Sequence, residues 1–337
     1  MIQVYLYVHK DQEETKSIVE LLNRYQQEFP HKLSFITIEN DNYLKVAYKN
    51  KDSVLDIGPY RLLEPIKEDE IKFAFTETTK KLEAAESIGN TLIKERFTEV
   101  PKIIGSDKFS YWFSKHYMFL FNLAVFFYVG FAFLAPVLMK LEKPKAANVI
   151  YKIYSPLCHQ LAFRSFFIFG EQYAYPRDLA NVESLKTYGE ETGFDEFDIV
   201  TARNFVGNEI LGYKVALCER DIAIYLAIFA FGVIFSISRN RINSIPWYLW
   251  IILGIVPIGL DGFSQLLSQT GIPLLSWIPL RESSPLLRAL TGGLFGLFTA
   301  WFGYPFVEES VAESRNQIEN KMALIRQLDK DKGKKPN

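Results

Sequence analysis

Cysteine and histidine are scarce in this sequence, and this restricts the chemistry that it can carry. The 337 residues include only two Cys and four His. Two Cys are too few for a disulfide framework. The sequence also has no nucleotide-binding loop, no haem-attachment motif and no Ser-His-Asp order. The sequence alone therefore assigns no reaction, and it leaves open whether the protein is an enzyme.

An excess of charge of one sign is lacking as well. The chain has 38 Lys and Arg against 39 Asp and Glu, which gives a net charge of -1. The basic residues are interleaved with acidic ones, and no Lys/Arg block has the aromatic spacing of a nucleic-acid-binding groove. We therefore expect no nucleic-acid partner.

Hydrophobic sequence, in contrast, is abundant and unevenly distributed. The chain is 49% hydrophobic and 15% aromatic, and its long apolar runs lie between charged residues 1–115 and 307–337. Runs of about 20 apolar residues are typical of helices that cross a hydrocarbon core of about 30 Å. Four such spans are predicted, at residues 117–139, 222–237, 247–267 and 286–306. The sequence therefore predicts a multi-pass α-helical membrane bundle in the lipid bilayer, spanning residues 116–306.

The first 88 residues are predicted to form a soluble α/β domain. Residues 2–8 alternate like a strand, residues 13–29 have helical spacing, and residues 69–87 read as a helix with an acidic first turn. Between the two helices lie three extended runs, 32–38, 44–48 and 53–63. The resulting order of strand, helix, three strands and helix resembles the thioredoxin and glutaredoxin fold.

The turn that would carry a redox cysteine pair in such a domain has no thiol. Residues 9–13 read His-Lys-Asp-Gln-Glu. Disulfide exchange requires a thiolate, so thioredoxin-type chemistry is excluded. We interpret the domain as a binding or docking module, and a purely structural appendage is the alternative.

The charged flanks predict the orientation of the chain in a cell membrane. The start of the sequence has no small-residue cleavage site, so we expect no signal peptide and a cytoplasmic N-terminal domain. Four spans then place the C-terminus in the cytoplasm too. The short loop with Arg239 and Arg241 falls on the same side, as the positive-inside rule requires. Residues 140–220 would face outward.

Three segments outside the spans have patterns of their own. Residues 89–115 are predicted to be a linker that ends at the aromatic cluster 111–113, which suits a membrane interface. Residues 149–169 are apolar but include charged residues, which favours an interfacial or re-entrant helix, with a fifth span as the alternative. Residues 307–337 predict a charged cytoplasmic helix, either a short coiled coil or an amphipathic helix packed on the soluble domain. A membrane-protein partner could bind this helix or the N-terminal domain.

Polar residues distant in sequence are predicted to converge at the outward face of the bundle. Asp261 and Gln265 lie late in the third span, Arg288 and Arg220 begin the fourth and second spans, and Arg164 lies at a similar depth. Ionisable groups within spans cost about 2.5 to 3.5 kcal/mol and therefore need partners. We predict an Asp261–Arg288 ion pair, because antiparallel neighbours bring the end of one span beside the start of the next. Asp261 is also the candidate catalytic acid or base.

A second constellation includes both cysteines of the chain. Cys158, His159, Cys218 and Asp221 offer two thiolates, an imidazole and a carboxylate, which match a tetrahedral site for zinc or a similar soft metal in type. Adjacent Cys and His can bind one ion only in a non-helical turn, which Pro156 favours. Three interpretations stay open, namely a metal site, a Cys158–Cys218 disulfide and unligated side chains.

These motifs, taken in order, resemble a known family. They are Cys158-His159-Gln160, Arg164-Ser165-Phe166-Phe167, Leu217-Cys218-Glu219-Arg220 leading into Tyr225, Asp261-Gly262 with Gln265, and Arg288 with Thr291-Gly292. The family is an uncharacterised bacterial and archaeal group of predicted multi-span membrane proteins with a domain-of-unknown-function label. The resemblance covers about residues 115–306. Family members often have a second Cys at the position of Asp221, so this chain departs from a pure zinc–thiolate pattern.

Three functional hypotheses follow from these patterns. The first is a binding module for a small molecule or a lipid headgroup, in which Arg164, Arg220, Arg281 and Arg288 attract an anion. The second is an assembly subunit held to a larger complex by its soluble domain and its C-terminal helix. The third is a metal-dependent membrane enzyme that uses the Cys158 constellation. We rank a binding or assembly module above an enzyme.

Overall fold

The computed structural model describes residues 1–9, 15–269 and 279–333, with side chains as far as residue 330. The chain forms two compact units. The soluble unit consists of Met1–Ser114 and Ala312–Asn337, and the membrane unit consists of Lys115–Val311. The first unit is therefore built from two segments that lie far apart in the sequence.

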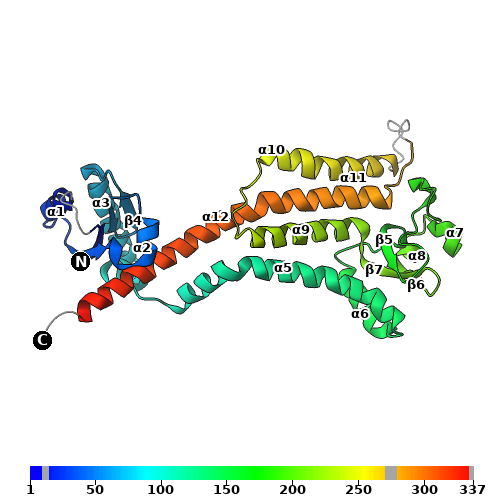
Figure 1. Ribbon diagram of the computed structural model, residues 1–337, viewed down its shortest axis with the longest axis horizontal. Coiled ribbons are helices and arrows are strands. Elements are labelled where there is room, and N and C mark those ends of the chain that lie inside the picture. Colours follow the sequence, from blue (N-terminus) through cyan, green and yellow to red (C-terminus); the bar gives the residue numbers. More distant parts are fainter. Residues whose placement is uncertain (10–14, 270–278, 334–337) are drawn as a thin grey trace. The chain divides into compact units, whose positions relative to one another are not determined.

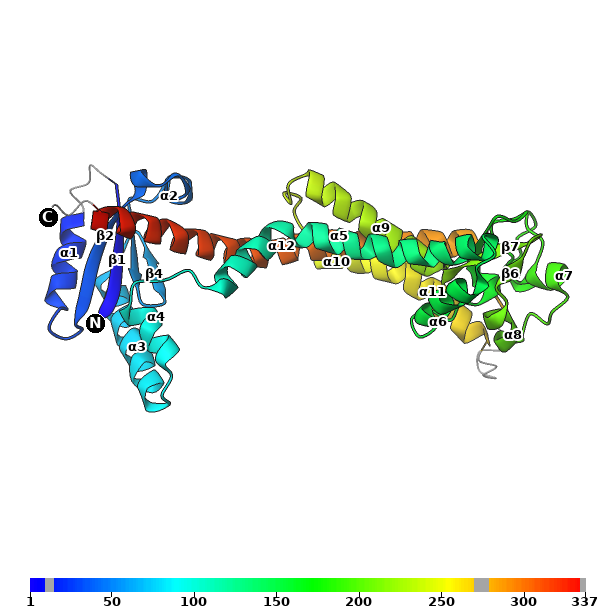
Figure 2. The same cartoon turned by 90° about the horizontal axis from the view of Figure 1, so that it is seen from below.

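The soluble unit contains a mixed four-stranded sheet, which is visible in Figure 2. Strand β1 (Ile2–Val8) is parallel to β2 (His31–Thr37) and antiparallel to β3 (Ser53–Ile57), and β3 is antiparallel to β4 (Tyr60–Leu63). The sheet order is β2-β1-β3-β4. The helices are α1 (Thr15–Arg24), the 3-10 turn η1 (Ile38–Asn40), α2 (Asn42–Ala47), α3 (Glu68–Ser87) and α4 (Thr91–Thr98). This topology agrees with the predicted thioredoxin-like domain.

Two of the predicted extended runs differ from the structure. Residues 44–48 were expected to be extended, but most of them lie in α2. The Asp41 carboxylate accepts hydrogen bonds from the backbone N–H groups of Tyr43 and Leu44 at 2.9 and 3.3 Å, and this cap starts the helix. The run 53–63 is a hairpin of β3 and β4. It turns at Gly58, where φ is +56° and an L side chain would be strained.

Strand β1 is buried on both faces. Ile2, Val4 and Leu6 pack against residues of α1 and α3, and Tyr5 and Tyr7 point to the opposite face. The second face is covered by Leu44 and Tyr48 together with Ala323 and Leu324 of helix α12 (Pro285–Gly333). The latter two side chains are 0% and 5% exposed. The C-terminal part of α12 therefore supplies one layer of the soluble unit.

Polar contacts fix α12 on this face. The Tyr48 hydroxyl donates to Asn320 Oδ1 at 2.8 Å. The Gln327 amide accepts from the Thr37 N–H at 3.1 Å and donates to the Thr37 carbonyl at 2.8 Å. Of the two interpretations of the tail, the structure shows the packed amphipathic helix, whose buried face is occupied by the soluble unit. The tail is also continuous with the fourth predicted span, because both belong to α12.

Within the described residues, four helices are long and apolar enough to cross a membrane, as the sequence predicts (Figure 1). They are α5 (Gly105–Lys140), α9 (Glu219–Ile237), the helix at residues 247–269, and α12. The third consists of α10 (Trp247–Leu249), six residues of π-helix called η4 (Trp250–Ile255), and α11 (Val256–Gln269). Pro257 lies two residues after the end of the π-helix. A proline lacks the N–H that an α-helix needs at this point, so the wider turn is expected there.

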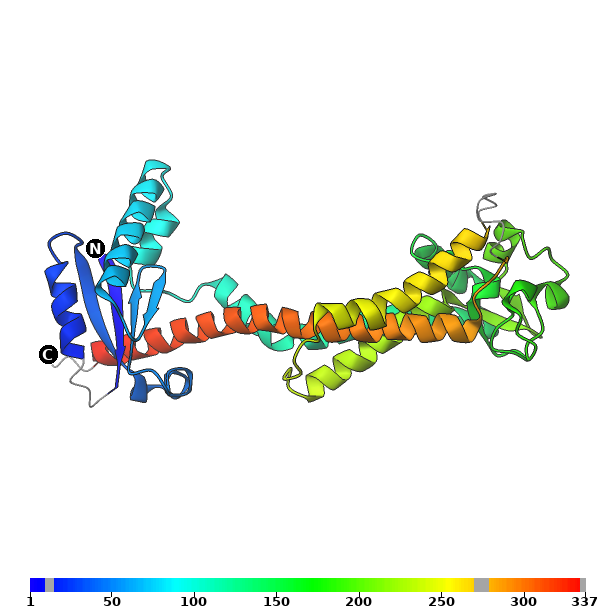
Figure 3. The same ribbon diagram turned by 90° about the horizontal axis from the view of Figure 1, so that it is seen from above.

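Glycines bring α9 and α12 into close backbone contact. A Cβ at Gly296 would lie 2.2 Å from the Ile224 carbonyl oxygen, and one at Gly292 would lie 2.7 Å from that of Arg220. Only glycine fits at these positions. Figure 3 shows α11 and α12 running side by side, and the Trp250 indole of η4 donates to Thr299 Oγ1 of α12 at 3.1 Å. The first turns of α9 and α12 therefore meet near the end of α11.

The segment between α5 and α9 forms a small folded cap at that end of the bundle (Figure 1). It contains α6 (Pro144–Tyr154), η2 (Ala162–Arg164), β5 (Ser165–Ile168), η3 (Asp178–Ala180), α7 (Tyr188–Thr192), α8 (Ile199–Asn204), β6 (Gly207–Asn208) and β7 (Gly212–Cys218). Its antiparallel sheet has the order β5-β7-β6.

Two further expectations about segments outside the spans need correction. The helix predicted within residues 149–169 ends at Tyr154, and the chain continues as a turn and strand β5. Helix α6 has 11 residues, or about 16 Å at 1.5 Å per residue, which is too short to span. Residues 89–115, predicted to be a linker, contain α4 and the first turns of α5.

We expect Leu324→Ala to destabilise the soluble unit by about 2 to 5 kcal/mol, because it removes a buried side chain from the layer that covers Tyr5 and Tyr7. Hydrogen exchange of the β1 amides in the full-length protein measures this effect. Gln317→Ala, on an exposed position of the same helix, is the matched control. Unchanged protection of β1 in the Leu324 variant would show that the helix contributes no stability to the sheet.

Candidate functional site

Six elements and connecting segments meet where the cap joins the bundle, and they position a group of charged and polar side chains. The first turns of α9 and α12 supply Glu219, Arg220 and Arg288. Helix α11 supplies Asp261, η2 supplies Arg164, and the segment before α12 supplies Arg281, Glu282 and Ser283. Arg177 comes from the loop after β5. All of these residues belong to the membrane unit.

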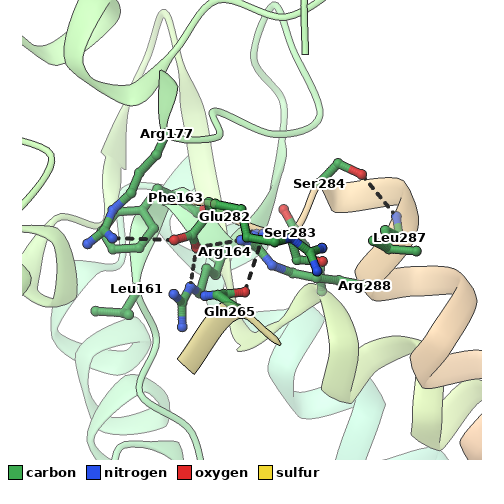
Figure 4. A network of polar contacts seen from close by, with 12 residues as sticks. Leu161, Phe163, Arg164, Arg177, Gln265, Glu282, Ser283, Ser284, Leu287 and Arg288 are labelled. Carbon is green, nitrogen blue, oxygen red and sulfur yellow. Dashed lines mark hydrogen bonds and ion pairs between the residues drawn. The ribbon is translucent and has the colours of Figure 1, made fainter. Parts of the chain in front are cut away.

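Glu282 is the centre of this group (Figure 4). Its side chain is completely buried, and it accepts from Arg164 Nε and from an Arg288 terminal nitrogen at 2.6 Å each. A terminal nitrogen of Arg177 lies 3.3 Å from its other oxygen. These arginines hold the pKa of the Glu282 carboxyl below its usual value, against the opposing effect of burial. One carboxylate therefore faces three cations.

Arg288 and Arg177 are the buried cations of this group. Arg288, 3% exposed, also donates to Glu219 Oε2 at 2.9 Å and to the Phe163 carbonyl at 3.2 Å. The Arg177 guanidinium lies 3.8 Å from the centre of the Phe163 ring. Burial lowers the pKa of Arg177, and its Nε and one terminal nitrogen have no hydrogen-bond partner among the described residues. The cation–π contact replaces only part of its lost hydration.

Asp261 is the second acidic centre. It is paired with Arg220, with Arg281 at 2.9 Å, and with the Ser283 hydroxyl at 2.8 Å. Gln265 lies one turn further along α11 and accepts from the Ser283 N–H at 3.3 Å. The predicted Asp261–Arg288 pair is therefore wrong. Residues that directly precede α12 bind both partners instead. Arg281 and Ser283 bind Asp261, and Glu282 binds Arg288.

These residues together form what we call the arginine–carboxylate network. It contains Arg164, Arg177, Arg220, Arg281 and Arg288 with Glu219, Asp261 and Glu282. With five arginines and three carboxylates, its formal charge is +2. The carboxylate side chains are at most 3% exposed, whereas those of Arg164, Arg220 and Arg281 are 30%, 24% and 34% exposed. The uncompensated positive charge therefore lies on the solvent-accessible side of the network.

The structure brings together the polar residues that the sequence singles out and adds others. Arg164, Arg220, Asp261, Gln265 and Arg288 all lie in or against the network. Glu219, Glu282, Arg177 and Ser283 are missing from the prediction. The sequence does contain a signal for Glu282, because the polar run Arg-Glu-Ser-Ser directly precedes the proline that starts α12. The aromatic contact of Arg177 depends on tertiary structure and has no sequence signal.

The two cysteines form a separate cluster at the start of α9. The sulfur atoms of Cys158 and Cys218 and a carboxylate oxygen of Asp221 lie within 4.8 Å of one another, and the two sulfur atoms are not bonded to each other. Cys158 follows α6, and Cys218 is the residue before the first turn of α9. His159, predicted to be a fourth ligand, has an exposed side chain and lies outside this cluster. Although His159 is adjacent to Cys158 in the turn, its side chain does not join the two sulfur atoms.

Backbone N–H groups are directed at the Cys158 sulfur. The Cys218 N–H lies 3.3 Å from it, and the Gln160 N–H also donates to it. A hydrogen bond from the Cys218 thiol, followed by that of Gln160, lowers the pKa of Cys158, whereas the same thiol pairing and burial raise the pKa of Cys218. Of the two thiols, that of Cys158 is therefore the more acidic.

Gln160 and Lys214 hold this turn in place. Gln160 is in the left-handed region with φ of +53°, and its side-chain amide donates to the carbonyls of Tyr151 and Ala216 at 3.0 Å each. The fully buried Lys214 ammonium group donates to the Gln160 and Arg203 carbonyls at 2.8 and 2.6 Å. Burial lowers the pKa of Lys214 to about 7, while the nearby Cys158 opposes this shift.

Comparisons with known proteins agree with the family resemblance. Residues 202–302 match a family described as Predicted membrane protein (DUF2085). An uncharacterised protein of Methanocaldococcus jannaschii is 25% identical over 205 residues, which cover 58% of this chain and 96% of that protein. No solved structure matches the chain significantly. The chain is thus similar to uncharacterised membrane proteins, and the matched region contains Cys218, Asp221 and most of the network.

We expect Glu282→Gln to lower the thermal midpoint of the detergent-solubilised protein, because a neutral amide leaves three arginines around a buried site, at a cost of about 3 to 5 kcal/mol. The folded pKa of Glu282 is below its unfolded value of 4.5. Its contribution is therefore complete above that pH and is lost as the pH falls through the folded pKa. Wild type should lose more stability on acidification than the variant.

The matched control is Glu171→Gln, which changes a carboxylate that is 64% exposed on the surface of the cap. Equal midpoints for the Glu282 and Glu171 variants would mean that the network does not hold the bundle and the cap together.

Proposed function

We propose that the protein binds a phosphate-bearing anion, the headgroup of an acidic lipid, at the arginine–carboxylate network. The observation that carries this proposal is the surplus of arginine over carboxylate in a group whose carboxylates are buried and whose Arg164, Arg220 and Arg281 are partly exposed. Guanidinium groups match phosphate oxygens in geometry and remain charged at all physiological pH values. A phosphate at these three residues would neutralise the surplus.

The position of the network supports a lipid source for the phosphate. Arg220 and Arg288 lie in the first turns of the helices at residues 219–237 and 285–330, and Asp261 lies eight residues before the end of the third helix. The ends of membrane helices lie at the level of the lipid headgroups. The bilayer that surrounds the protein therefore presents phosphate at the depth where these arginines are found.

Binding of acidic lipid tests this proposal. We expect native mass spectrometry of the solubilised protein to show tighter retention of phosphatidylglycerol than of phosphatidylcholine. Arg281→Gln should weaken retention about tenfold, since one charge-assisted hydrogen bond contributes about 1.5 kcal/mol. Asp261 keeps Arg220 as its partner in this variant. Lys186→Gln, which removes a cation that is 60% exposed elsewhere on the cap, is the matched control.

A parallel titration with inorganic phosphate separates the two sources of the anion. Displacement of lipid by millimolar phosphate would indicate a site for a free anion. Equal retention of both lipids, unaffected by Arg281→Gln, would refute an anion site of either kind.

We further propose that the protein lies in the cell membrane with the soluble unit in the cytoplasm and the cap outside. Arg239 and Arg241 follow α9 at the end opposite the network, and the positive-inside rule assigns that end to the cytoplasm. This orientation places the anion site in the outer leaflet.

Cysteine labelling measures the orientation. A membrane-impermeant maleimide should react with a Lys186→Cys variant in intact cells, because the side chain is exposed on the cap. A Gln317→Cys variant in the soluble unit should react only after lysis. The reverse pattern would contradict the proposed orientation, and it would move the anion site to the inner leaflet.

A further inference from the structure

Cys158, Cys218 and Asp221 lie outside the arginine–carboxylate network, and their geometry indicates a separate site. Two thiols in contact are explained equally well by a disulfide, but Asp221 is not. Its carboxylate oxygen lies within 4.8 Å of both sulfur atoms. A disulfide makes no use of a carboxylate, whereas the half-buried Asp221, in the first turn of α9, places an oxygen beside both sulfur atoms.

We propose that Cys158, Cys218 and Asp221 bind a zinc ion, with a fourth position open to water or another ligand. Zinc takes thiolate and carboxylate ligands at about 2.3 and 2.1 Å in a tetrahedron, so ligand atoms lie about 3.5 to 3.8 Å apart. The three ligand atoms here lie within 4.8 Å. Side-chain rotations that shorten the longest of these separations by about 1 Å bring the atoms to that spacing.

The surroundings of Cys158 are those of a metal-bound thiolate. Two backbone N–H groups, from Cys218 and Gln160, donate to its sulfur. Such outer hydrogen bonds orient ligands and delocalise thiolate charge. The Gln160 N–H is held in this direction by a left-handed backbone, which costs about 1 kcal/mol in a non-glycine residue. The two hydrogen bonds of its side chain offset that cost.

The charges of the cluster also balance. Binding releases the two thiol protons, so that two thiolates and one carboxylate carry three negative charges against the two positive charges of the ion. The remaining negative charge is one that a protonated Lys214, which is buried and donates to the Gln160 carbonyl, would balance. With the ion in place, the turn after α6, the end of β7 and the first turn of α9 are joined by one centre.

Metal content of the protein purified without chelators tests this proposal. We expect about one zinc per chain, and loss of the metal in Cys158→Ser and Cys218→Ser. Asp221→Asn should bind zinc about ten to a hundred times more weakly, since it removes one charged ligand. His159→Ala is the matched control. It should keep the metal, because its side chain is exposed and lies outside the cluster.

A second measurement does not depend on whether the cysteine variants fold. Cobalt(II) added to the wild-type apoprotein should give the near-ultraviolet absorption of a thiolate–cobalt bond, and zinc should abolish it. A protein without metal whose cysteines are joined in a disulfide by mass spectrometry, or react as two free thiols in the presence of zinc, overturns the proposal. Metal lost equally in His159→Ala would overturn the ligand assignment. None of these readouts depends on lipid binding.

Discussion

The arrangement of the cap and the bundle depends on a single buried carboxylate. Glu282 binds Arg164 from the cap, Arg177 from the loop beyond β5 and Arg288 from α12. Each arginine would be costly to bury without a counter-charge, and together they repel one another. Because Glu282 contacts all three, the residues just before α12, the cap and the fourth span hold one arrangement. The three carboxylates balance only three of the five arginines, so the partly exposed side of the network, with Arg164, Arg220 and Arg281, has a net positive charge.

Four consecutive residues connect the two proposed sites. Cys218 and Asp221 point to Cys158, whereas Glu219 binds Arg288 and Arg220 binds Asp261. This division follows from the helix, since residues three apart share a face and the two between them turn away. The close approach of α9 to α12 at Gly292 and Gly296 fixes the direction of that first turn. Either ligand would therefore stabilise the part of the chain on which the other depends.

The sequence predicts the elements whose signal is local, and it misses those whose partner is distant. The sequence predicts the four spans, the thioredoxin-like order and the convergence of Asp261, Arg220 and Arg288. These features depend on the length of apolar runs and on the cost of burying a charge, and both can be judged from the sequence alone. The ion-pair partners of Asp261 are not predicted, because several arginines lie at the same depth in the bundle. The tertiary structure of the residues before α12 determines which of them bind Asp261. Residues 44–48 have an apolar pattern that fits a short strand or a helix equally well, and the Asp41 cap selects the helix.

The composition of the soluble unit has a consequence for biosynthesis. During translation the first 114 residues emerge from the ribosome without Ala323 and Leu324, the side chains that help to cover Tyr5 and Tyr7. One face of the sheet stays incompletely covered until every membrane helix has been made. The domain made first is completed last, so that a truncated product carries an exposed apolar surface by which cellular quality control can recognise it.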